Sequence, residues 1–493
     1  MKITRLAQGL LAGLLGCAAV AVPAAVGAAT AQADVASALV FNQRTEGHDC
    51  YRIPTIVKAN DGALLAFAEG RNGGATFCND LGKIDLVMKR STDGGKSWSA
   101  LNTIIESNGD TKDNPVPIVI PNSNRIVLLS VLECYTSPEC NRIPRVSISD
   151  DNGLHWGAPR VLTTELGFST APSWLATGPS HGIVLTRGAH AGRLVAGMSY
   201  SNTGSIIYSD DQGATWHRGA TENPSASELN PQEISVTELA DGRIYAAARN
   251  PDTEKKCDNG GTHNHAFAIS SDGGATFSQK FAYVTDVVGP DVEGSTGRMS
   301  ATDTGGKYNR LLFAAPSVCS SRQQLRIHSS FDEGANWTGT ADSLLVWGQD
   351  AAYSDMVPLS PSSTGVLFEA GSGGNPYASI RYATITDTDL GAPACGGGYS
   401  VLESKPLGTA GTVYLSYNAA NGKNCVSTMK SASTGTATAT SAYLEVEGSS
   451  RITDSGSFSY FAGPVSATAA NKCVKWGGAT GGQSFDSEFV HCD

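Results

Sequence analysis

The chain has 493 residues, of which only 16% are charged, and 46 acidic side chains stand against 35 basic ones. A formal net charge of −11 excludes a protein that binds nucleic acid through a basic surface, and it requires that any site for an anionic ligand be a local cluster of arginines. Beyond the first 33 residues no stretch is apolar over the length that a membrane-spanning helix needs, so we expect no transmembrane anchor.

The first 33 residues are predicted to be a secretory signal peptide. Two basic residues precede an apolar run over 10–22, and small residues at 31–33 fit a cleavage site after Ala33. A lipoprotein cut at Cys17 is the less favoured alternative, because it would leave a long apolar tail on the mature protein. The sequence therefore predicts a protein that is secreted and extracellular.

One eight-residue motif returns at a nearly constant spacing and organises the chain. It reads STDGGKSW at Ser91–Trp98 and starts again at Ser149, Ser209, Ser270 and Ser330, which gives steps of 58, 60, 61 and 60 residues. The Ser, Asp and Gly positions favour a turn, and the closing Trp or Phe is a large apolar side chain that can be buried between neighbouring units. A fixed period of this length is typical of an array of supersecondary units.

Apolar and alternating runs around each copy predict β-strands. Runs such as 84–90 and 145–148 lead into the motif, and each copy has a second run upstream, at 63–71, 125–133, 193–200, 243–249 and 310–316. A sixth run at 365–369 is followed by 378–385 without the motif. Six all-β units of about sixty residues predict a six-bladed β-propeller with five motif hairpins, over residues 34–394.

The candidate site residues stand at the ends of these runs or in the loops between them. In chain order they are Arg52 in Tyr-Arg-Ile-Pro, Arg71, Asp80, Asn114, Glu233, Arg249, Arg322, Tyr353 in Ala-Tyr-Ser-Asp, and Glu369. Taken singly, each has a plain structural explanation, since charges at strand ends are usually solvated and a tyrosine in an apolar run is usually a core residue. Their combination and order carry the functional interpretation.

In this order, and with five copies of the repeated motif, the sequence resembles the secreted bacterial sialidases (neuraminidases) of the Asp-box family over about residues 39–387. The resemblance implies a retaining exo-α-sialidase. It implies a substrate carboxylate held by Arg52, Arg249 and Arg322, with Asp80 as acid/base, Tyr353 as nucleophile and Glu233 as the carboxylate that activates it. It further implies that Arg71 is an auxiliary pocket arginine, that Glu369 orients Arg52, and that the aspartates of the repeated motif are structural. At Asn114-Pro115 the sequence departs from the acid that this family often holds in the pocket.

The chemistry of a sialic acid explains these residue types. Its anomeric carbon carries a carboxylate, which guanidinium groups bind by charge-assisted hydrogen bonds. A carboxylate nucleophile would be repelled by that anionic centre, whereas a neutral tyrosine is not, and sialidases are a known exception to the usual carboxylate pair of glycosidases. Asp80 must be protonated to serve the leaving oxygen, and because an exposed carboxylate is ionised at neutral pH, burial by the pocket or the aglycone must raise its pKa.

The cysteines fit an oxidising compartment, because ten remain when Cys17 is removed with the signal peptide. Cys50 and Cys78 flank the first long loop, Cys134 and Cys140 are near in sequence, and Cys257 and Cys319 lie in neighbouring units. No zinc-type spacing is present, and His263 and His265 are predicted to be solvated in a loop. We expect no metal and no cofactor.

After about residue 393 the composition shifts to Ser, Thr, Gly and Ala, with short alternating runs at 412–417 and 442–446. Residues 395–493 are therefore predicted to form a small β-rich module of unknown role, held by Cys425, Cys473 and Cys492, with Cys395 as a further candidate.

Two alternatives to hydrolysis remain open at this point. A lectin-like propeller would bind sialic acid without turnover, but it would need only the arginines and not Asp80, Glu233 and Tyr353. Transfer of the sialyl group, to another sugar or within the molecule, would use the same residues. In each case the expected partners are sialylated glycoproteins, glycolipids or oligosaccharides, and the protein is predicted to be a monomer.

Overall fold

The computed structural model describes residues 34–73, 76–135, 141–224, 229–251 and 264–492, so the predicted signal peptide lies outside the described residues. Within these ranges the regular structure is β-strand, apart from three short 3-10 helices, η1 (Gly188–His190), η4 (Thr302–Thr304) and η5 (Thr340–Asp342). None of the described helices has the length and apolar character needed to cross a membrane. The all-β prediction is confirmed.

The first sheet contains two antiparallel groups of strands joined by one parallel bridge, between Ile84 and Thr111. The strand order is β2-β3-β4-β6-β7-β8-β9, with β5 on the free edge of β4. The strands are β2 (Cys50–Lys58), β3 (Leu64–Asn72), β4 (Lys83–Ser91), β5 (Asn102–Ile105), β6 (Thr111–Val119), β7 (Ile126–Glu133), β8 (Ile143–Ser149) and β9 (Arg160–Val161).

Two antiparallel sheets follow along the chain. The order in the first is β10-β12-β13-β14, with β11 also paired to β12, and the second runs β15-β16-β17-β18. The strands are β10 (Leu175–Thr177), β11 (Ile183–Val184), β12 (Leu194–Tyr200), β13 (Thr203–Ser209), β14 (His217–Glu222), β15 (Gln232–Glu238), β16 (Ile244–Arg249), β17 (His265–Ser270) and β18 (Gln279–Tyr283).

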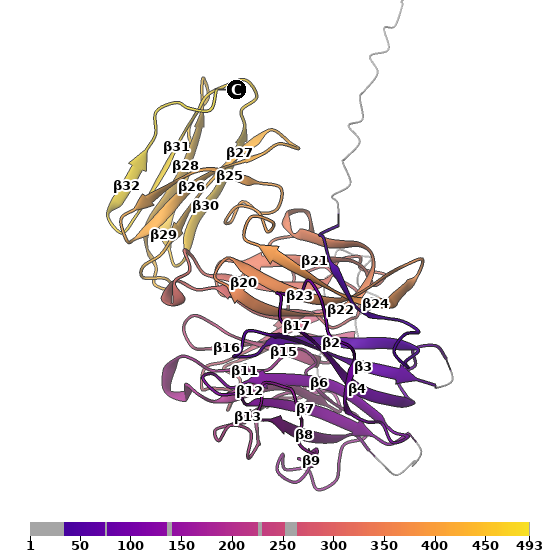
Figure 1. The fold of residues 1–493 in the computed structure, drawn as a ribbon. Coiled ribbons are helices and arrows are strands. Elements are labelled where there is room, and N and C mark those ends of the chain that lie inside the picture. The colour runs from indigo at the N-terminus through magenta and orange to yellow at the C-terminus, as the bar shows by residue number, and fades with distance from the viewer. Residues whose placement is uncertain (1–33, 74–75, 136–140, 225–228, 252–263, 493) are drawn as a thin grey trace, which may run out of the picture. The chain divides into compact units, whose positions relative to one another are not determined.

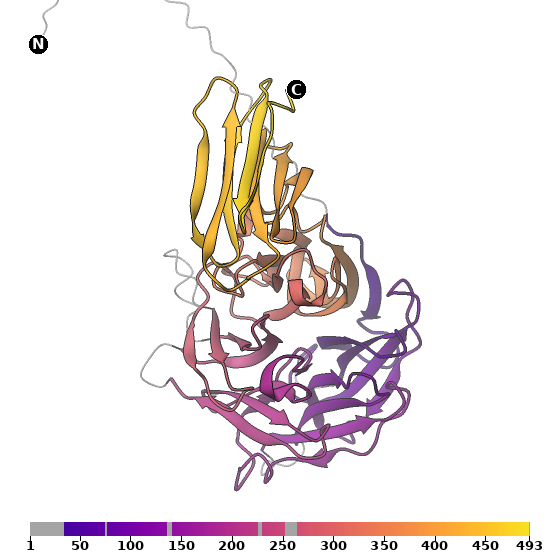
Figure 2. The same cartoon turned by 90° about the vertical axis from the view of Figure 1, so that its left-hand side faces the viewer.

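The fourth sheet closes the ring, because β1, the first described strand, pairs antiparallel with β24 in the order β1-β24-β23-β22-β21-β20-β19. β22 is 17 residues long and pairs with β21 along its first part and with β23 along its second. The strands are β1 (Ala38–Asn42), β19 (Ser295–Ser300), β20 (Arg310–Pro316), β21 (Gln323–Ser330), β22 (Leu344–Ser360), β23 (Ser363–Ser372) and β24 (Asn375–Thr386). Figure 2 shows the sheets following one another around this ring, which is a β-propeller.

The repeated motif forms the same hydrogen-bonded hairpin turn at each of its five positions. The Ser hydroxyl donates to the Asp carboxylate at 2.8–2.9 Å and accepts the N–H of the following Gly at 2.8–2.9 Å. The same carboxylate accepts the backbone N–H four residues on, at 2.8–3.0 Å. The closing aromatic packs on a neighbouring group of strands, as with Trp98 on Tyr382 of β24 and Trp156 on Phe67 of β3.

Residues 400–486 form two further antiparallel sheets, drawn in orange to yellow in Figure 1. One has the order β25-β26-β27-β30 and the other β29-β28-β31-β32, and a shared apolar cluster that includes the buried Trp476 fills the space between them. The strands are β25 (Ser400–Leu407), β26 (Gly411–Asn418), β27 (Lys423–Lys430), β28 (Thr438–Val446), β29 (Ile452–Phe458), β30 (Phe461–Thr468), β31 (Val474–Thr480) and β32 (Gln483–Asp486).

Three disulfides join pairs of described cysteines, whose connectivity the sequence left open. These are Cys50–Cys78, Cys395–Cys425 and Cys473–Cys492. Cys134 and Cys319 are also disulfide-bonded, and Cys140 and Cys257 lie outside the described residues.

The prediction that His265 is solvated is wrong. His265 begins β17 and is buried, with its ring 5.2 Å from that of Phe313. Burial, with the neighbouring His328, lowers its pKa to about 3. The run into β17 begins earlier than the sequence pattern suggested, which converts a predicted loop position into a core position. His263 lies outside the described residues.

Candidate active site

Among the strands that carry a β-bulge or register irregularity, four have a predicted site residue at it. The irregularities lie between Arg52 and Thr55 in β2, Asp113 and Val116 in β6, Gln232 and Ile234 in β15, and Ala351 and Ser354 in β22. Ile53, Asn114 and Glu233 have positive φ angles of 55°, 52° and 45°, which non-glycine residues rarely adopt. A bulge re-aims side chains next to it, and here it turns side chains from strands far apart in the sequence toward one pocket.

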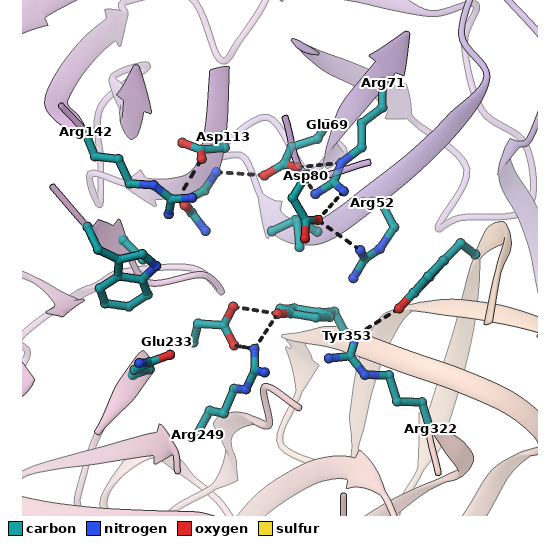
Figure 3. Close-up of a pocket in the computed structure, with 16 residues that line it drawn as sticks. Arg52, Glu69, Arg71, Asp80, Asp113, Arg142, Glu233, Arg249, Arg322 and Tyr353 are labelled. Carbon is teal, nitrogen blue, oxygen red and sulfur yellow. Dashed lines mark hydrogen bonds and ion pairs between the residues drawn. The ribbon is translucent and has the colours of Figure 1, made fainter. Parts of the chain in front are cut away.

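The pocket is a cavity of about 320 Å³ lined by sixteen residues, shown in Figure 3. Eight of the nine predicted site residues line it, namely Arg52, Arg71, Asp80, Asn114, Glu233, Arg249, Arg322 and Tyr353. The ninth, Glu369, is fully buried behind Arg52 and accepts the Nε–H of that arginine at 2.7 Å. The structure therefore brings all nine together.

Tyr353 and Glu233 form a close pair just below the centre of Figure 3. The phenol of Tyr353 donates to Glu233 Oε1 at 2.5 Å, and Arg249 Nη1 lies 2.8 Å from Glu233 Oε2 and 3.2 Å from Tyr353 Oη. Burial, together with the Glu233 carboxylate, raises the pKa of Tyr353 well above its ordinary value. In the free protein this tyrosine is a neutral phenol bound to the group that can take its proton.

The three arginines predicted to hold the substrate carboxylate differ in how far their charges are already compensated. Arg52 is paired with Glu369, and Arg249 with both Glu233 and Asp291. Arg322 instead donates to the Tyr377 hydroxyl at 3.0 Å and to the Asp291 carbonyl at 3.3 Å, and no carboxylate among the described residues forms an ion pair with it. Of these three arginines, Arg322 therefore has the positive charge that is most available to an anionic ligand.

Buried carboxyl groups hold the backbone on either side of Tyr353. Glu369 accepts the N–H of Ile53 at 3.0 Å and that of Tyr353 at 3.2 Å. Glu293 accepts the Ser180 hydroxyl at 2.8 Å and the Ser354 N–H at 3.3 Å, and burial raises its pKa well above the ordinary value. These long-range contacts fix β22 against the strands that carry the arginines.

Asp80 lies at the pocket mouth, with 76% of its side chain exposed, and faces the arginines rather than a neutral environment. Its Oδ1 is 2.6 Å from Arg71 Nη1 and 3.6 Å from Arg52 Nη1. Desolvation acts to raise the pKa of Asp80, but Arg71, Arg52 and Arg322 outweigh it and lower that pKa below its ordinary value. The protonated state that acid catalysis needs is therefore not the resting state of this group.

Arg71 is satisfied by protein atoms on all three nitrogens. Its Nε and Nη2 donate to Glu69 Oε2 at 3.0 and 2.5 Å. Its Nη1 donates to the Cys78 and Asn79 carbonyls at 3.1 and 3.2 Å, and to Asp80. Figure 3 shows the resulting chain of contacts from Glu69 through Arg71 to Asp80.

Several pocket residues were not found from the sequence, namely Glu69, Asp113, Arg142, Trp174, Gln232 and Tyr377. Burial, helped by Glu69 and opposed by Arg142, raises the pKa of Asp113 to about 8. Asp113 directly precedes Asn114-Pro115, so the pocket does hold an acid beside the point where the sequence departs from the family. Asn114 itself is held through its backbone, whose N–H donates to Glu69 at 2.9 Å.

Among the described residues, no group of three or more His, Cys, Asp or Glu side chains is arranged to hold a metal ion. The arginines, carboxyl groups and tyrosine that line the pocket can bind a carboxylate, transfer protons and supply a phenol oxygen as a nucleophile.

The chain resembles known proteins in sequence. A family model described as a BNR repeat-like domain matches residues 62–363. A sialidase from Micromonospora viridifaciens is 28% identical over 379 residues, which are 72% of this chain and 54% of that protein. Spore-associated protein A from Streptomyces coelicolor is 47% identical over 107 residues, 22% of this chain and 68% of that protein. The chain spans between about half and two thirds of the length of the sialidases from Micromonospora viridifaciens and Bacteroides fragilis.

Solved structures share the fold. The Hadza microbial sialidase Hz136 has a TM-score of 0.59 and 22% identity over 71% of this chain and 68% of its own. An intramolecular trans-sialidase from Ruminococcus gnavus, in complex with oseltamivir carboxylate, has a TM-score of 0.59 and 16% identity over 74% of this chain and all of its own. At these identities the likeness shows the β-propeller fold alone.

Proposed function

The chain belongs to the BNR repeat-like family, and on that premise we propose that it is a retaining exo-α-sialidase that hydrolyses terminal α-linked sialic acid from glycoconjugates. Arg52, Arg249 and Arg322 are the proposed ligands of the substrate carboxylate. Tyr353 is the proposed nucleophile, Glu233 its base, and Asp80 the acid and base for the aglycone. No cofactor is part of the proposal.

The observation that carries the proposal is the bond of 2.5 Å between the Tyr353 phenol and Glu233, with Arg249 touching both groups. A binding protein would gain nothing from a buried phenol poised on a carboxylate, whereas a nucleophile needs a base within hydrogen-bond reach. Arg249 donates to Tyr353 Oη and would stabilise the negative charge that develops there as the proton leaves.

The proposed reaction has two steps and needs no reagent besides the substrate and water. The Tyr353 proton passes to Glu233 as the phenol oxygen bonds to the anomeric carbon. The bond from that carbon to the aglycone oxygen breaks, and the oxygen takes a proton from Asp80. In the second step a water molecule replaces Tyr353 at the anomeric carbon, its proton goes to Asp80, and the phenol recovers its proton from Glu233. Two displacements give overall retention of configuration.

Substrate binding would also convert Asp80 into an acid. The pKa of Asp80 is lowered chiefly by Arg71 and Arg52 acting against desolvation. A substrate carboxylate on Arg52 and Arg322 would neutralise part of that positive charge, and the aglycone would exclude water from the pocket mouth. Both changes favour the neutral carboxylic acid and raise its pKa toward the range that general acid catalysis requires.

The finer organisation of the chain is part of the same proposal. We assign one blade each to β2–β5, β6–β9, β10–β14 and β15–β18, a fifth to β19–β21 with the first part of β22, and a sixth to the rest of β22 with β23, β24 and β1. Residues 34–394 would be the six-bladed catalytic domain and 395–493 a separate module, with 1–33 a signal peptide for secretion. Ring contacts between Tyr308 and Tyr414 and between Phe331 and Phe461 connect the two parts.

A fluorogenic aryl sialoside tests the proposal directly. Purified protein should release the fluorophore, and proton NMR of the reaction should show the α-anomer of free sialic acid before mutarotation. Absence of release at high enzyme concentration would contradict hydrolysis and favour a binding protein. An anhydro sugar, or sialic acid on an added acceptor sugar, would identify transfer as the main reaction.

A further inference from the structure

The segment that carries Asp80, residues 76–82 between β3 and β4, is mostly exposed. Phe77 and Leu81 have 45% and 39% of their surface exposed, and the Asp80 side chain is more exposed still. The buried exceptions are Cys78 and Gly82. Gly82 is held by Thr111 of β6, whose hydroxyl accepts its N–H at 3.2 Å and donates to its carbonyl at 3.0 Å. Asp80 thus lies midway between two fixed points.

Cys78 is fixed from two directions by residues that face each other across β2 and β3. Cys50 and Arg71 are partners in the strand register. Cys50, fully buried at the start of β2, holds the Cys78 side chain through the disulfide, and Arg71 Nη1 holds the Cys78 carbonyl at 3.1 Å. The same Nη1 then reaches the Asn79 carbonyl and the Asp80 carboxylate.

The same two strands carry the carboxylate site. Arg52 lies two residues after Cys50 on β2, and it faces Glu69 on β3. Glu69 in turn holds Arg71 through Nε and Nη2. The same two strands therefore position both Arg52, which would bind the substrate carboxylate, and Asp80, which would protonate the leaving oxygen.

We infer that the Cys50–Cys78 disulfide and Arg71 act together as a double anchor that positions Asp80 for proton transfer to the leaving oxygen. The inference rests on the proposed function and goes beyond it, because it gives Arg71 a role in positioning Asp80. It also gives the disulfide a part in catalysis and not only in stability.

A positioning role makes a prediction that a purely structural role does not. A displaced acid matters for a leaving group that must be protonated, such as the sugar oxygen of sialyllactose. It matters little for 4-nitrophenolate, which departs as the anion. The ratio of kcat/KM for these two substrates reports the acid step of the first displacement, since kcat/KM ends at the first irreversible step. General acid catalysis contributes typically 10²–10⁴-fold, so the ratio has a wide range.

The experiment compares the double variant Cys50→Ser/Cys78→Ser with Cys473→Ser/Cys492→Ser, which removes a disulfide between residues near the C-terminus. Asp80→Asn serves as the limit in which the acid is absent. For the first variant kcat/KM on sialyllactose should fall at least ~10-fold more than on 4-nitrophenyl sialoside, in the same direction as for Asp80→Asn but less far. The control should show the wild-type ratio. The inhibition constant of the 2,3-didehydro sialic acid analogue should stay within ~3-fold, because the arginines remain in place.

Arg71→Lys tests the second anchor and does not depend on whether the cysteine variant folds. It keeps the charge but loses the fork that binds Glu69 and the loop carbonyls together, so the substrate ratio should shift in the same direction. Equal losses on both substrates in these variants, or a weakening of the analogue in proportion to the loss of activity, would overturn the inference while leaving the hydrolase itself intact. Failure of the wild-type protein to cleave either substrate would instead overturn the proposed function, and the inference with it.

Discussion

The hairpins of the repeated motif and the pocket are built from the same kinds of side chain. The hydrogen-bond partners of these side chains, however, lie at different distances along the sequence. Each hairpin aspartate takes its hydrogen bonds from within four residues, as Asp211 does from Ser209 and Thr215. In the pocket, Tyr353 bonds a carboxylate 120 residues away and Arg52 one 317 residues away. The hairpins are locally complete, whereas the pocket exists only when the ring of sheets has closed.

The two regions also differ in what remains unsatisfied. In the hairpins the hydrogen bonds consume the acceptor capacity of the aspartates, and those from His155 lower the pKa of Asp151 to about 2. In the pocket Arg322 has no carboxylate partner among the described residues, and the Asp80 carboxylate sits where a ligand could compete for its arginines. A polar cluster whose hydrogen bonds are all made within the protein stabilises the fold, whereas a cluster that lacks a partner can bind a ligand.

The sharpest test of this contrast removes the nucleophile. Tyr353→Phe should lose at least ~10³-fold in kcat while still binding a sialic acid analogue, because the arginines are untouched. Glu233→Gln should be impaired as well, and the double variant should cost much less than the two losses combined, since the pair acts as one unit. Steady-state kinetics and inhibitor titration measure both effects. Additive losses would show that the two residues act independently.

Arg322→Lys changes the one pocket arginine without a carboxylate partner among the described residues. The lysine keeps the positive charge but loses the planar fork that binds a carboxylate through two parallel bonds. We expect a loss of transition-state binding of about 2–4 kcal/mol, seen as a lower kcat/KM. A value within twofold of wild type would remove Arg322 from the site.

Asp211→Ala should lower the stability of the protein and leave its activity unchanged. It deletes the acceptor of three hydrogen bonds at 2.6–2.8 Å in one hairpin, and Asp211 does not line the pocket. We expect a loss of about 1–2 kcal/mol in stability, measured as a lower thermal midpoint, with kcat of the folded protein unchanged. Gln212→Asn is the matched control, because this exposed neighbour has a positive φ that asparagine accepts. A drop in kcat without loss of stability would assign the hairpin to catalysis.

The smallest expected effect is an uptake of protons on ligand binding. The pKa of Asp80 is lowered in the free protein by the neighbouring arginines acting against desolvation, and a bound carboxylate analogue would raise it. Between those two pKa values the complex holds more protons than the free protein, so binding at about pH 5 should take up part of a proton. Calorimetry in buffers of different ionisation enthalpy measures this uptake, and it should vanish in Asp80→Asn. Proton release would show that the sign of the coupling is reversed.

Much of the fold could be predicted from the sequence, because the residues of each repeated motif are close together in the chain. The turn chemistry of Ser91–Trp98 recurs at every copy, and the strand that precedes Arg249 is visible as an apolar run. The bulges with positive φ at Ile53 and Glu233 were not visible, because they depend on how neighbouring strands pair. Glu69 and Asp113 were missed for the same reason, because the contact of Glu69 with the Asn114 N–H and that of Asp113 with Arg142 join residues far apart in the sequence.

The most direct test of the central claim is chemical trapping of the nucleophile. A 2,3-difluoro sialic acid should accumulate a covalent sialyl-enzyme, because the fluoride at the anomeric carbon leaves without an acid as Tyr353 attacks, and the fluorine at C3 slows the second displacement. Digestion and tandem mass spectrometry should place the sugar on Tyr353 of the wild-type protein and find no adduct in Tyr353→Phe. An adduct on any other residue, or turnover of a true sialoside by Tyr353→Phe at the wild-type rate, would contradict the assignment.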